Sequence, residues 1–377
     1  MSKILVTKPF QAPFEEITAE MQRAWDAQWL TNNGPLLKEF EAGLNGYLGT
    51  KDCAVVSNGT VAIQVALQAL GIKGEVITTP FSYVATTSTI VWEGCTPVFV
   101  DIDAKTFNID PVQIESAITE KTTAILATHV FGVPCDVEAI EHIAKRHNLK
   151  VIYDAAHCFG TKINGVSILN YGDLSTLSLH ATKLMHSVEG GAIFVNDSSP
   201  KVEGLTERVS PLRYTVNRLR NFGHFGPEVF DGVGINAKNS EIHAAIGLVN
   251  LRYAEEIMED RERQHKRYDQ GLATLTLTKP EIAENVDWNK SYYPVVFRGE
   301  EEALHVLEGL EACGIYARRY FYPALNTLPY IISPGKTPNA AAISTSILCL
   351  PLYYGLEDEK INRVIEEVVR LCNEFRS

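Results

Sequence analysis

Two residues in the middle of the chain have the types and spacing of a cofactor site. Asp154 follows the apolar run Val151–Tyr153, and Lys183 ends the stretch Leu177-Ser178-Leu179-His180-Ala181-Thr182-Lys183. A carboxylate at a strand end can pair with a ring nitrogen and keep it protonated, while a lysine on a neighbouring loop can form a Schiff base with an aldehyde. Pyridoxal phosphate joins an aldehyde to a pyridine, so the pair predicts an electron sink and its covalent anchor.

A second motif has the character of a phosphate site. The turn Ser57-Asn58-Gly59-Thr60 joins the run Ala54–Val56 to a nearly all-apolar segment, Thr60–Leu70, which we expect to be a buried helix. Backbone N–H groups at a helix start, a glycine that permits close approach and a threonine hydroxyl together favour a phosphate. The alternative is an ordinary helix N-cap, because Ser, Asn and Thr are all preferred there.

Each of these residues also has a purely structural interpretation. A lone aspartate at a strand end more often caps the next helix, and a lone lysine is more often a solvated cation. The order in which these residues occur favours a cofactor site over the structural interpretations. A phosphate-type turn is followed by an aromatic residue after the next strand, an aspartate after a later strand, and then Ser-x-x-x-x-Lys. Gly190-Gly191 lacks the frame of a dinucleotide fingerprint, and the histidines show no metal-binding spacing, so we expect neither a nicotinamide nor a metal.

The elements that must position these residues are short buried strands alternating with helices. Apolar runs of this kind without polar alternation suit strands covered on both faces, which predicts an α/β fold with a mostly parallel mixed sheet flanked by helices. Beyond about residue 239 the sequence changes to a long charged helical pattern, so we expect a large domain over residues 1–240, with an N-terminal arm, and a smaller C-terminal α/β domain over residues 241–377. The predicted strands are Ala54–Val56, Glu75–Thr79, Pro97–Val100, Ala124–Thr128, Val151–Tyr153, Leu174–Leu177 and Ala192–Val195.

Composition narrows the class of protein further. The 377 residues are 45% hydrophobic with a formal net charge of -12, and no long charged block is present, so neither nucleic acid nor an anionic membrane is an expected partner. The seven cysteines show no C-x-x-C pair, which predicts reduced thiols. The first nine residues lack a signal-peptide core, and no apolar stretch approaches the roughly 20 residues of a membrane span. We therefore expect a cytoplasmic protein.

This ordered set resembles the DegT/DnrJ/EryC1/StrS family of sugar aminotransferases. The resemblance extends over almost the whole chain, from Trp29–Pro35 and Glu39-Phe40-Glu41 to Ala317–Pro323. It implies the pyridoxal-phosphate-dependent transferase fold of type I, similar to aspartate aminotransferase, and pyridoxal 5'-phosphate as the cofactor.

The resemblance assigns the cofactor's phosphate and ring to residues of the matching motifs. Gly59 and Thr60 stand in the family's phosphate-binding turn, and Ser178 should add a further phosphate hydrogen bond. Tyr83, in Pro80-Phe81-Ser82-Tyr83-Val84-Ala85-Thr86, stands where the family has the aromatic ring that stacks on the pyridine.

The reactive part of the cofactor is assigned in the same way. The resemblance implies that Asp154 pairs with the pyridine nitrogen, that His157 lies near the ring hydroxyl, and that Lys183 is both the attachment point and the proton carrier. Asn236 matches an asparagine that reaches the cofactor phosphate of the neighbouring subunit, which implies a homodimer with shared active sites. Lys238 stands where the family usually has arginine, so bidentate anion binding is lost there.

Within the family, the residues around Lys183 are most similar to enzymes that make dTDP-4-amino-4,6-dideoxyglucose from the 4-keto-6-deoxy sugar nucleotide, with L-glutamate as amino donor. Aminotransferases that act at C3, or on UDP-linked 4-keto sugars, remain alternatives, as do a sugar dehydratase and a non-catalytic regulatory protein. Lys183 argues against the last two, because the dehydratases typically have histidine in its place and a regulatory role places no demand on a lysine. Substrate contacts are expected from Asn32, Asn33, Arg318, Arg319 and Tyr320, with Arg213, Arg218 and Arg220 as alternative partners of the diphosphate.

Overall fold

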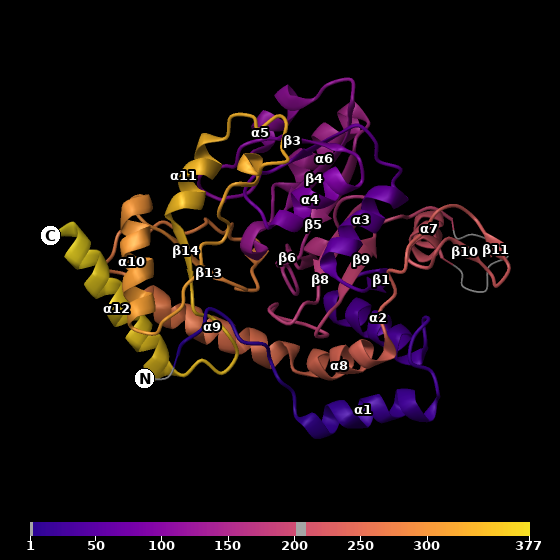
Figure 1. Cartoon of the computed structure of the whole chain (residues 1–377), viewed down its shortest axis with the longest axis horizontal. Coiled ribbons are helices and arrows are strands. Elements are labelled where there is room, and N and C mark those ends of the chain that lie inside the picture. Colours follow the sequence, from indigo (N-terminus) through magenta and orange to yellow (C-terminus); the bar gives the residue numbers. More distant parts are fainter. Residues whose placement is uncertain (1–2, 201–208) are drawn as a thin grey trace.

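The computed structural model describes residues 3–200 and 209–377, and a seven-stranded sheet forms its centre (Figure 1). The strand order is β1-β9-β8-β5-β4-β2-β3. Strands β3, β2, β4, β5 and β8 run parallel, whereas β9 is antiparallel to both of its neighbours. The strands are β1 (Cys53–Val56), β2 (Glu75–Thr78), β3 (Thr96–Phe99), β4 (Thr122–Thr128), β5 (Lys150–Asp154), β8 (Leu174–Ser178) and β9 (Gly191–Val195).

The predicted α/β fold with its mostly parallel mixed sheet is confirmed. Each of the seven predicted strands is present, with ends that differ by one or two residues. Successive side chains of a strand face opposite sides of the sheet, and both sides are apolar here: Val151 and Tyr153 belong to one hydrophobic cluster, and Ile152 belongs to another. Covering both faces requires the continuous apolar runs that the sequence contains.

Helices cover the two faces, and the predicted buried helix after the phosphate-type turn is α3. Its buried side chains face β8 and β9, and its two strongly polar residues, Gln64 and Gln68, both donate to Glu93 at its rim. Short 3-10 turns span Glu115–Ala117, Val130–Gly132, Ile168–Asn170 and Leu325–Thr327. The helices before residue 240 are α1 (Phe14–Asp26), α2 (Pro35–Leu48), α3 (Gly59–Ala69), α4 (Val84–Trp92), α5 (Pro111–Ile114), α6 (Val137–His147) and α7 (Pro211–Leu219).

The C-terminal region, residues 241–377, begins with α8 and continues into the long charged helix α9. It contains a hydrophobic cluster of its own, which Ile4 of the N-terminal arm joins. The division at residue 240 stays a prediction. The elements of this region are α8 (Glu241–Arg252), α9 (Ala254–Gly271), β12 (Val286–Asp287), β13 (Tyr293–Val296), α10 (Glu300–Ala312), α11 (Pro338–Ser346), β14 (Ile347–Leu350) and α12 (Asp358–Arg376).

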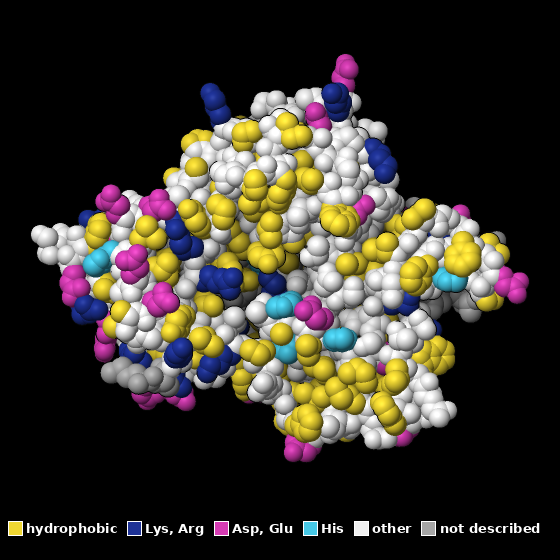
Figure 2. Space-filling model, viewed as in Figure 1, with side chains coloured by type: hydrophobic (Ala, Val, Ile, Leu, Met, Phe, Trp, Pro, Cys, Tyr) yellow, Lys and Arg dark blue, Asp and Glu magenta, His cyan; other side chains and the backbone are white. Residues whose placement is uncertain are grey.

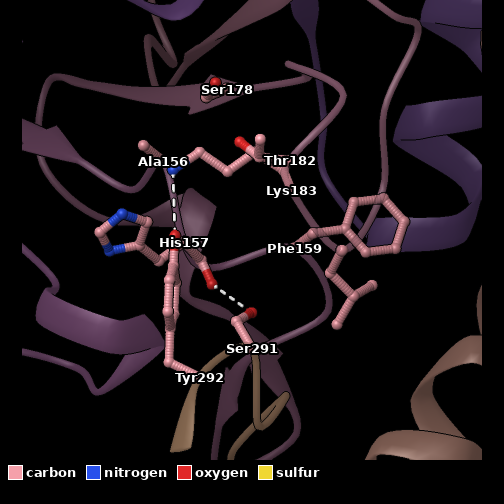
Figure 3. A pocket seen from close by; sticks show the side chains of 9 residues that line it. Ala156, His157, Phe159, Ser178, Thr182, Lys183, Ser291 and Tyr292 are labelled. Carbon is pink, nitrogen blue, oxygen red and sulfur yellow. Dashed lines mark hydrogen bonds between the residues drawn. The ribbon is translucent and has the colours of Figure 1, made fainter. Parts of the chain in front are cut away.

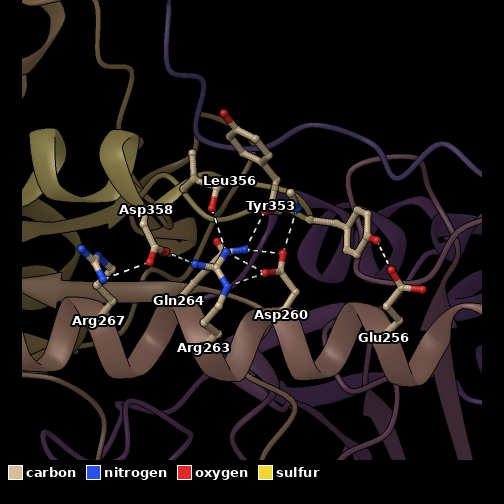
Figure 4. A network of polar contacts seen from close by, with 10 residues as sticks. Glu256, Asp260, Arg263, Gln264, Arg267, Tyr353, Leu356 and Asp358 are labelled. Atoms are coloured by element: carbon tan, nitrogen blue, oxygen red, sulfur yellow. Dashed lines mark hydrogen bonds and ion pairs between the residues drawn. The ribbon is translucent and has the colours of Figure 1, made fainter.

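Polar contacts fasten the end of the chain to α9 (Figure 4). Arg263 contacts Asp358 at the start of α12 and donates to the carbonyl oxygen of Leu356 at 2.8 Å. Arg267 donates to the same aspartate at 3.0 Å, and Asp260 accepts from the backbone N–H of Gly355 at 2.8 Å. The charged face of α9 therefore binds the turn that precedes α12, which explains why a helix with so few apolar residues is stable there.

Small strands complete the fold. Strand β12 pairs with β6 (Lys162–Ile163), which also pairs with β7 (Val166–Ser167), and the hairpin of β10 (His224–Phe225) and β11 (Val229–Phe230) projects beside α7 in Figure 1. Within residues 3–200 and 209–377, no helix has both the length and the apolar character needed to cross a membrane. In the same ranges, no three His, Cys, Asp or Glu side chains are grouped as metal ligands, and all seven cysteines are free thiols.

Candidate active site

A cavity of about 640 Å³ opens at the carboxyl edge of the parallel strands, where the C-terminal region meets the sheet. Figure 2 shows a hollow near the middle of this face, with basic and histidine side chains beside it. The register of the sheet explains its position, because Asp154 at the end of β5 lies opposite Thr176 of β8, two residues before Ser178. Of the residues expected at a cofactor or substrate site, the cavity is lined by Gly59, Thr60, Tyr83, Asp154, His157, Ser178, Lys183, Arg318 and Tyr320.

The phosphate-type turn forms one end of the cavity. Asn58 is the N-cap of α3, and its side-chain oxygen accepts from the N–H of Val61 at 2.9 Å. Both interpretations of the turn thus apply, since a capped helix start still presents N–H groups to the cavity. Gly59 packs tightly on the end of β8: a Cβ there would lie 3.0 Å from the Cβ of Ser178. The structure therefore brings the turn and this serine together.

Asp154 is buried, and its carboxylate accepts from two neutral donors. The hydroxyl of Thr86 donates at 2.6 Å, and the backbone N–H of Ala156 donates at 3.2 Å. Thr86 in turn shares a hydrogen bond of 2.8 Å with Ser82, so a chain of buried hydroxyls fixes the carboxylate. Burial raises the pKa of Asp154, and these hydrogen bonds and the charge of Lys183 only partly oppose it. A cation placed against this carboxylate would stabilise its charged form and lower its pKa again.

Lys183, from the loop after β8, lines this cavity and also a small pocket beside it, which Figure 3 shows. Its Nζ donates to the hydroxyl of Tyr292 at 3.3 Å. Burial lowers the pKa of Lys183, against the opposing charge of Asp154. A lysine with a lowered pKa is more readily present as the free amine, which is the form that attacks a carbonyl and accepts a proton.

His157 forms a wall of the cavity between two aromatic rings. Its imidazole stacks on Phe321, with ring centroids 5.6 Å apart, and meets the edge of Tyr292 at 4.9 Å. Burial lowers its pKa well below the ordinary value, and the positive charge of Lys183 lowers it further. The imidazole is therefore neutral at pH 7 and can act as a hydrogen-bond donor or acceptor but not as a cation.

Three of the expected residues lie at the mouth of the cavity. Tyr83 precedes the first residue of α4, lines the cavity and is 56% exposed. Arg318 lies over the ring of Tyr320, with its guanidinium carbon 5.1 Å from the ring centroid. Because this arginine is exposed, it places a positive charge at the entrance.

Four expected residues lie elsewhere. Arg319 donates to the carboxylate of Glu300 at 2.8 Å and to a backbone carbonyl at 2.9 Å, so it is engaged in local contacts outside the cavity. Asn32 and Asn33 line a second cavity of about 490 Å³ together with Arg218, Arg220 and Lys238. Asn236 is exposed, and its backbone pairs with Asn221 beside the β10–β11 hairpin.

Several residues at the site were missed by the sequence analysis, and three of them make contacts described above. Thr86 holds Asp154, and its signal was present, since it lies one helical turn after Ser82 in the stretch quoted for Tyr83. Tyr292 and Phe321 come from the C-terminal region and reach the cavity only through the tertiary fold. Phe321 had a local signal, because it directly follows the expected Tyr320, whereas no local pattern around Tyr292 predicts its contact.

Comparison with known proteins agrees with this site. A sequence model of the DegT/DnrJ/EryC1/StrS aminotransferase family matches residues 12–369. A dTDP-4-amino-4,6-dideoxy-D-glucose transaminase of Shigella dysenteriae is 39% identical over 374 residues, which cover 97% of this chain and 98% of the relative. A GDP-perosamine synthase of Caulobacter vibrioides is 35% identical, covering 90% of this chain and 91% of its own.

A solved structure of DesI, obtained in the presence of its TDP-sugar product, superposes with a TM-score of 0.91 at 32% identity. The match covers 100% of this chain and 95% of DesI. Fold, site and matches together define a sugar aminotransferase that depends on pyridoxal 5'-phosphate. The chain belongs to the DegT/DnrJ/EryC1/StrS aminotransferase family.

The residues of the cavity fit pyridoxal phosphate in three respects. The start of α3, closed by Gly59 against Ser178, offers N–H and hydroxyl donors for a phosphate. The buried carboxylate of Asp154, contacted by neutral donors, suits a protonated ring nitrogen. Lys183, whose side chain ends in an amine, lines the same cavity. The donor set thus matches a phosphate, a pyridinium and an aldehyde in one site.

Proposed function

We propose that Lys183 is the residue to which pyridoxal phosphate is attached and that its Nζ carries the proton in transamination. The observation that supports this proposal most directly is that Lys183 lines the same cavity as Asp154 and Gly59. Once bound, the cofactor supplies an electron-withdrawing ring that weakens a C–H bond of the amino donor. Asp154 contributes a fixed negative charge in a buried site, where electrostatic interactions are stronger than in water.

The other side chains then have defined roles in this proposal. Gly59, Thr60 and Ser178 bind the phosphate, and Tyr83 covers one face of the ring. The neutral imidazole of His157 accepts or donates a hydrogen bond at the ring hydroxyl without adding charge. Lys183, with its lowered pKa, takes a proton at Nζ and returns it to a different carbon.

We propose dTDP-4-keto-6-deoxy-D-glucose as the amino acceptor, L-glutamate as the donor, and dTDP-4-amino-4,6-dideoxy-D-glucose and 2-oxoglutarate as the products. The support is the identity of 39% and 37% with two transaminases named for that product. GDP-perosamine synthases at 35% and 32% identity make a GDP-linked keto sugar the main competitor. UDP-linked 4-keto sugars and 3-keto sugars are further alternatives. Arg318, Tyr320, Asn32 and Asn33 remain our candidates for contacts with the sugar nucleotide, and Arg319 is a weaker one because of its local contacts.

The visible absorbance of the bound cofactor distinguishes these substrates. L-Glutamate should bleach the absorbance of the purified holoenzyme, and dTDP-4-keto-6-deoxy-D-glucose should restore it with a kcat/KM at least tenfold above that for the GDP-linked or UDP-linked 4-keto sugar. The aminated carbon is then identified by NMR of the product. Recovery with a GDP-linked or 3-keto sugar alone would contradict the proposed substrate, and the absence of bleaching would contradict glutamate as donor.

We further propose a homodimer in which Asn236 of one subunit reaches the cofactor phosphate of the other. Asn236 is exposed and is not among the residues that line the cavity of its own chain. Apolar side chains also gather over α1 at the lower edge of Figure 2, where Phe14 and Trp25 are 72% and 66% exposed. An exposed patch of this kind is typical of an interface.

Sedimentation velocity tests this arrangement. The proposal predicts a dimer for the parent protein and for Asn236→Ala, together with weaker cofactor retention by the variant, because only the shared phosphate contact is lost. A monomeric parent, or an Asn236→Ala variant that holds the cofactor as tightly as the parent, would show that each site is formed by one chain.

A further inference from the structure

Within residues 3–200 and 209–377, the side chain of Tyr292 is the only one that forms a hydrogen bond with the Lys183 amine, and it comes from the C-terminal region. It directly precedes β13, and its hydroxyl accepts from Nζ at 3.3 Å (Figure 3). The two residues are 109 positions apart in the sequence. The fold therefore brings an acceptor from the second half of the chain to the amine that the sequence places in the first half.

The segment that carries Tyr292 is fastened to the cavity wall. The hydroxyl of Ser291 and the side-chain amide of Asn289 donate to the carbonyl oxygen of His157 at 2.9 and 2.7 Å. Arg261 of α9 is buried and donates to the carbonyl oxygens of Ser291 and Leu352 at 3.4 and 2.6 Å. These bonds hold the backbone just before the tyrosine independently of its hydroxyl.

The ring of Tyr292 is held by aromatic neighbours. It meets His157 edge to face at 4.9 Å, Tyr320 at 5.7 Å and Phe131 at 5.6 Å between centroids. Burial raises the pKa of Tyr292, so the phenol stays neutral. Its oxygen can accept from an ammonium group, and this charge-assisted bond is stronger than a bond to the neutral amine.

We propose that Tyr292 is a positioning residue that holds the amine of Lys183 whenever the cofactor has released it, and so sets where that amine waits between the two half-reactions. The inference rests on the role proposed for Lys183. The phenol oxygen binds the protonated amine more strongly than the neutral one. It therefore also offsets part of the free-energy cost of burying a charged lysine. The hydroxyl has this effect, while the ring packs on His157.

The test compares the full-length parent with Tyr292→Phe, both loaded with pyridoxamine 5'-phosphate, which carries its own amino group and leaves Lys183 free. The rate at which acetic anhydride labels Lys183 is followed against pH by peptide mass spectrometry. Loss of the hydroxyl removes an acceptor from the ammonium form of Lys183. The pH at which labelling reaches half its maximum rate, the labelling midpoint, should therefore fall by about one pH unit, as expected for one hydrogen bond to a charged group. The same variant should slow the glutamate half-reaction by about tenfold and displace its pH profile.

Tyr293→Phe is the matched control. Tyr293 is the next residue, and its hydroxyl donates to Asp269 at 2.7 Å instead of facing Lys183. This variant should label Lys183 with the parent's midpoint. A Tyr292→Phe protein with the parent's midpoint, or a higher one, would overturn the proposal and leave Tyr292 with a packing role only.

Two further measurements keep the test decisive. If Tyr292→Phe fails to fold, Ser291→Ala takes its place, because it removes one of the bonds that fasten the segment and keeps the phenol. It should shift the labelling midpoint in the same direction by a smaller amount, and an unchanged midpoint would count against the proposal. Borohydride reduction of the pyridoxal-phosphate form, followed by peptide mapping, shows separately whether Lys183 carries the cofactor. A failure of that role is thus distinguishable from a failure of Tyr292.

Discussion

Two buried carboxylates near the central sheet have opposite surroundings. Glu41 of α2 accepts from the guanidinium groups of Arg213 and Arg220 at 2.9 and 2.6 Å and from the N–H of Val55 at 2.8 Å. These charges hold its pKa below the ordinary value despite its burial. Asp154 accepts from a hydroxyl and one N–H, and its pKa is raised.

Under the proposed function, the difference separates a structural group, Glu41, from a functional one, Asp154. Glu41 is neutralised within its own chain, so its ion pairs contribute to holding α2 and α7 against β1. Asp154 has a fixed geometry without comparable compensation, which costs stability and suits a site that receives a cationic group. Perturbed carboxylates with incomplete compensation are characteristic of active sites. Replacement of Asp154 should therefore affect turnover, whereas replacement of Glu41 should affect folding.

The largest effect is expected from Asp154→Asn. Removal of the negative charge should lower kcat by about a hundredfold to a thousandfold, the range found for a single electrostatic contact in a water-excluded site. The cofactor-free variant should be at least as stable as the parent in urea unfolding at pH 7. Because the folded pKa of Asp154 is raised, any gain in stability should be largest above that pKa and vanish as pH falls below the ordinary value of 3.8. Near-parent turnover would contradict the role of Asp154.

The reverse pattern is expected from Glu41→Gln. Two buried arginines would lose their shared carboxylate, which should lower the free energy of unfolding by about 3–5 kcal/mol. Turnover per folded molecule should change by less than about threefold, because Glu41 lies outside the cavity. Urea unfolding combined with an activity assay at low temperature measures both quantities. A stable Glu41→Gln variant with strongly reduced turnover would contradict the structural role of Glu41.

The pH dependence of that stability loss is the smallest expected effect. The folded pKa of Glu41 is lowered from 4.5, so its contribution to stability is fully present above about pH 4.5 and is lost as pH falls through the folded pKa. The difference in unfolding free energy between parent and Glu41→Gln should therefore shrink below pH 4.5. A difference that grows on acidification would show that the arginines do not stabilise the charged form.

Much of the fold follows from local patterns. The continuous apolar runs predicted the seven strands because both faces of the sheet are covered, and the apolar stretch after Ser57 predicted α3. Asp154 could be placed at a strand end from its own apolar run, whereas Ser178 was assigned by the family resemblance, and the parallel register of β5 and β8 brings the two strand ends to one edge. The exact strand ends depend on pairing with neighbours, which the sequence does not display.

The residues that the sequence could not place depend on distant contacts. Tyr292 reaches the cavity because the C-terminal region packs against the carboxyl edge of the sheet, and Phe321, although it follows the expected Tyr320, arrives by the same packing. Arg319 resembled a substrate contact by its position next to Arg318, but the side chains of neighbouring residues diverge, and Glu300 binds the second arginine. The tandem pair carried no information about which of the two would face the cavity.

Peptide mapping of the attached cofactor shows directly whether Lys183 is the residue that carries it. The holoenzyme is reduced with borohydride, digested and analysed by peptide mass spectrometry. The account predicts that the mass of the reduced cofactor lies on Lys183 and that Lys183→Ala carries none. A cofactor found on another lysine, or retained covalently by Lys183→Ala, would contradict the site proposed here.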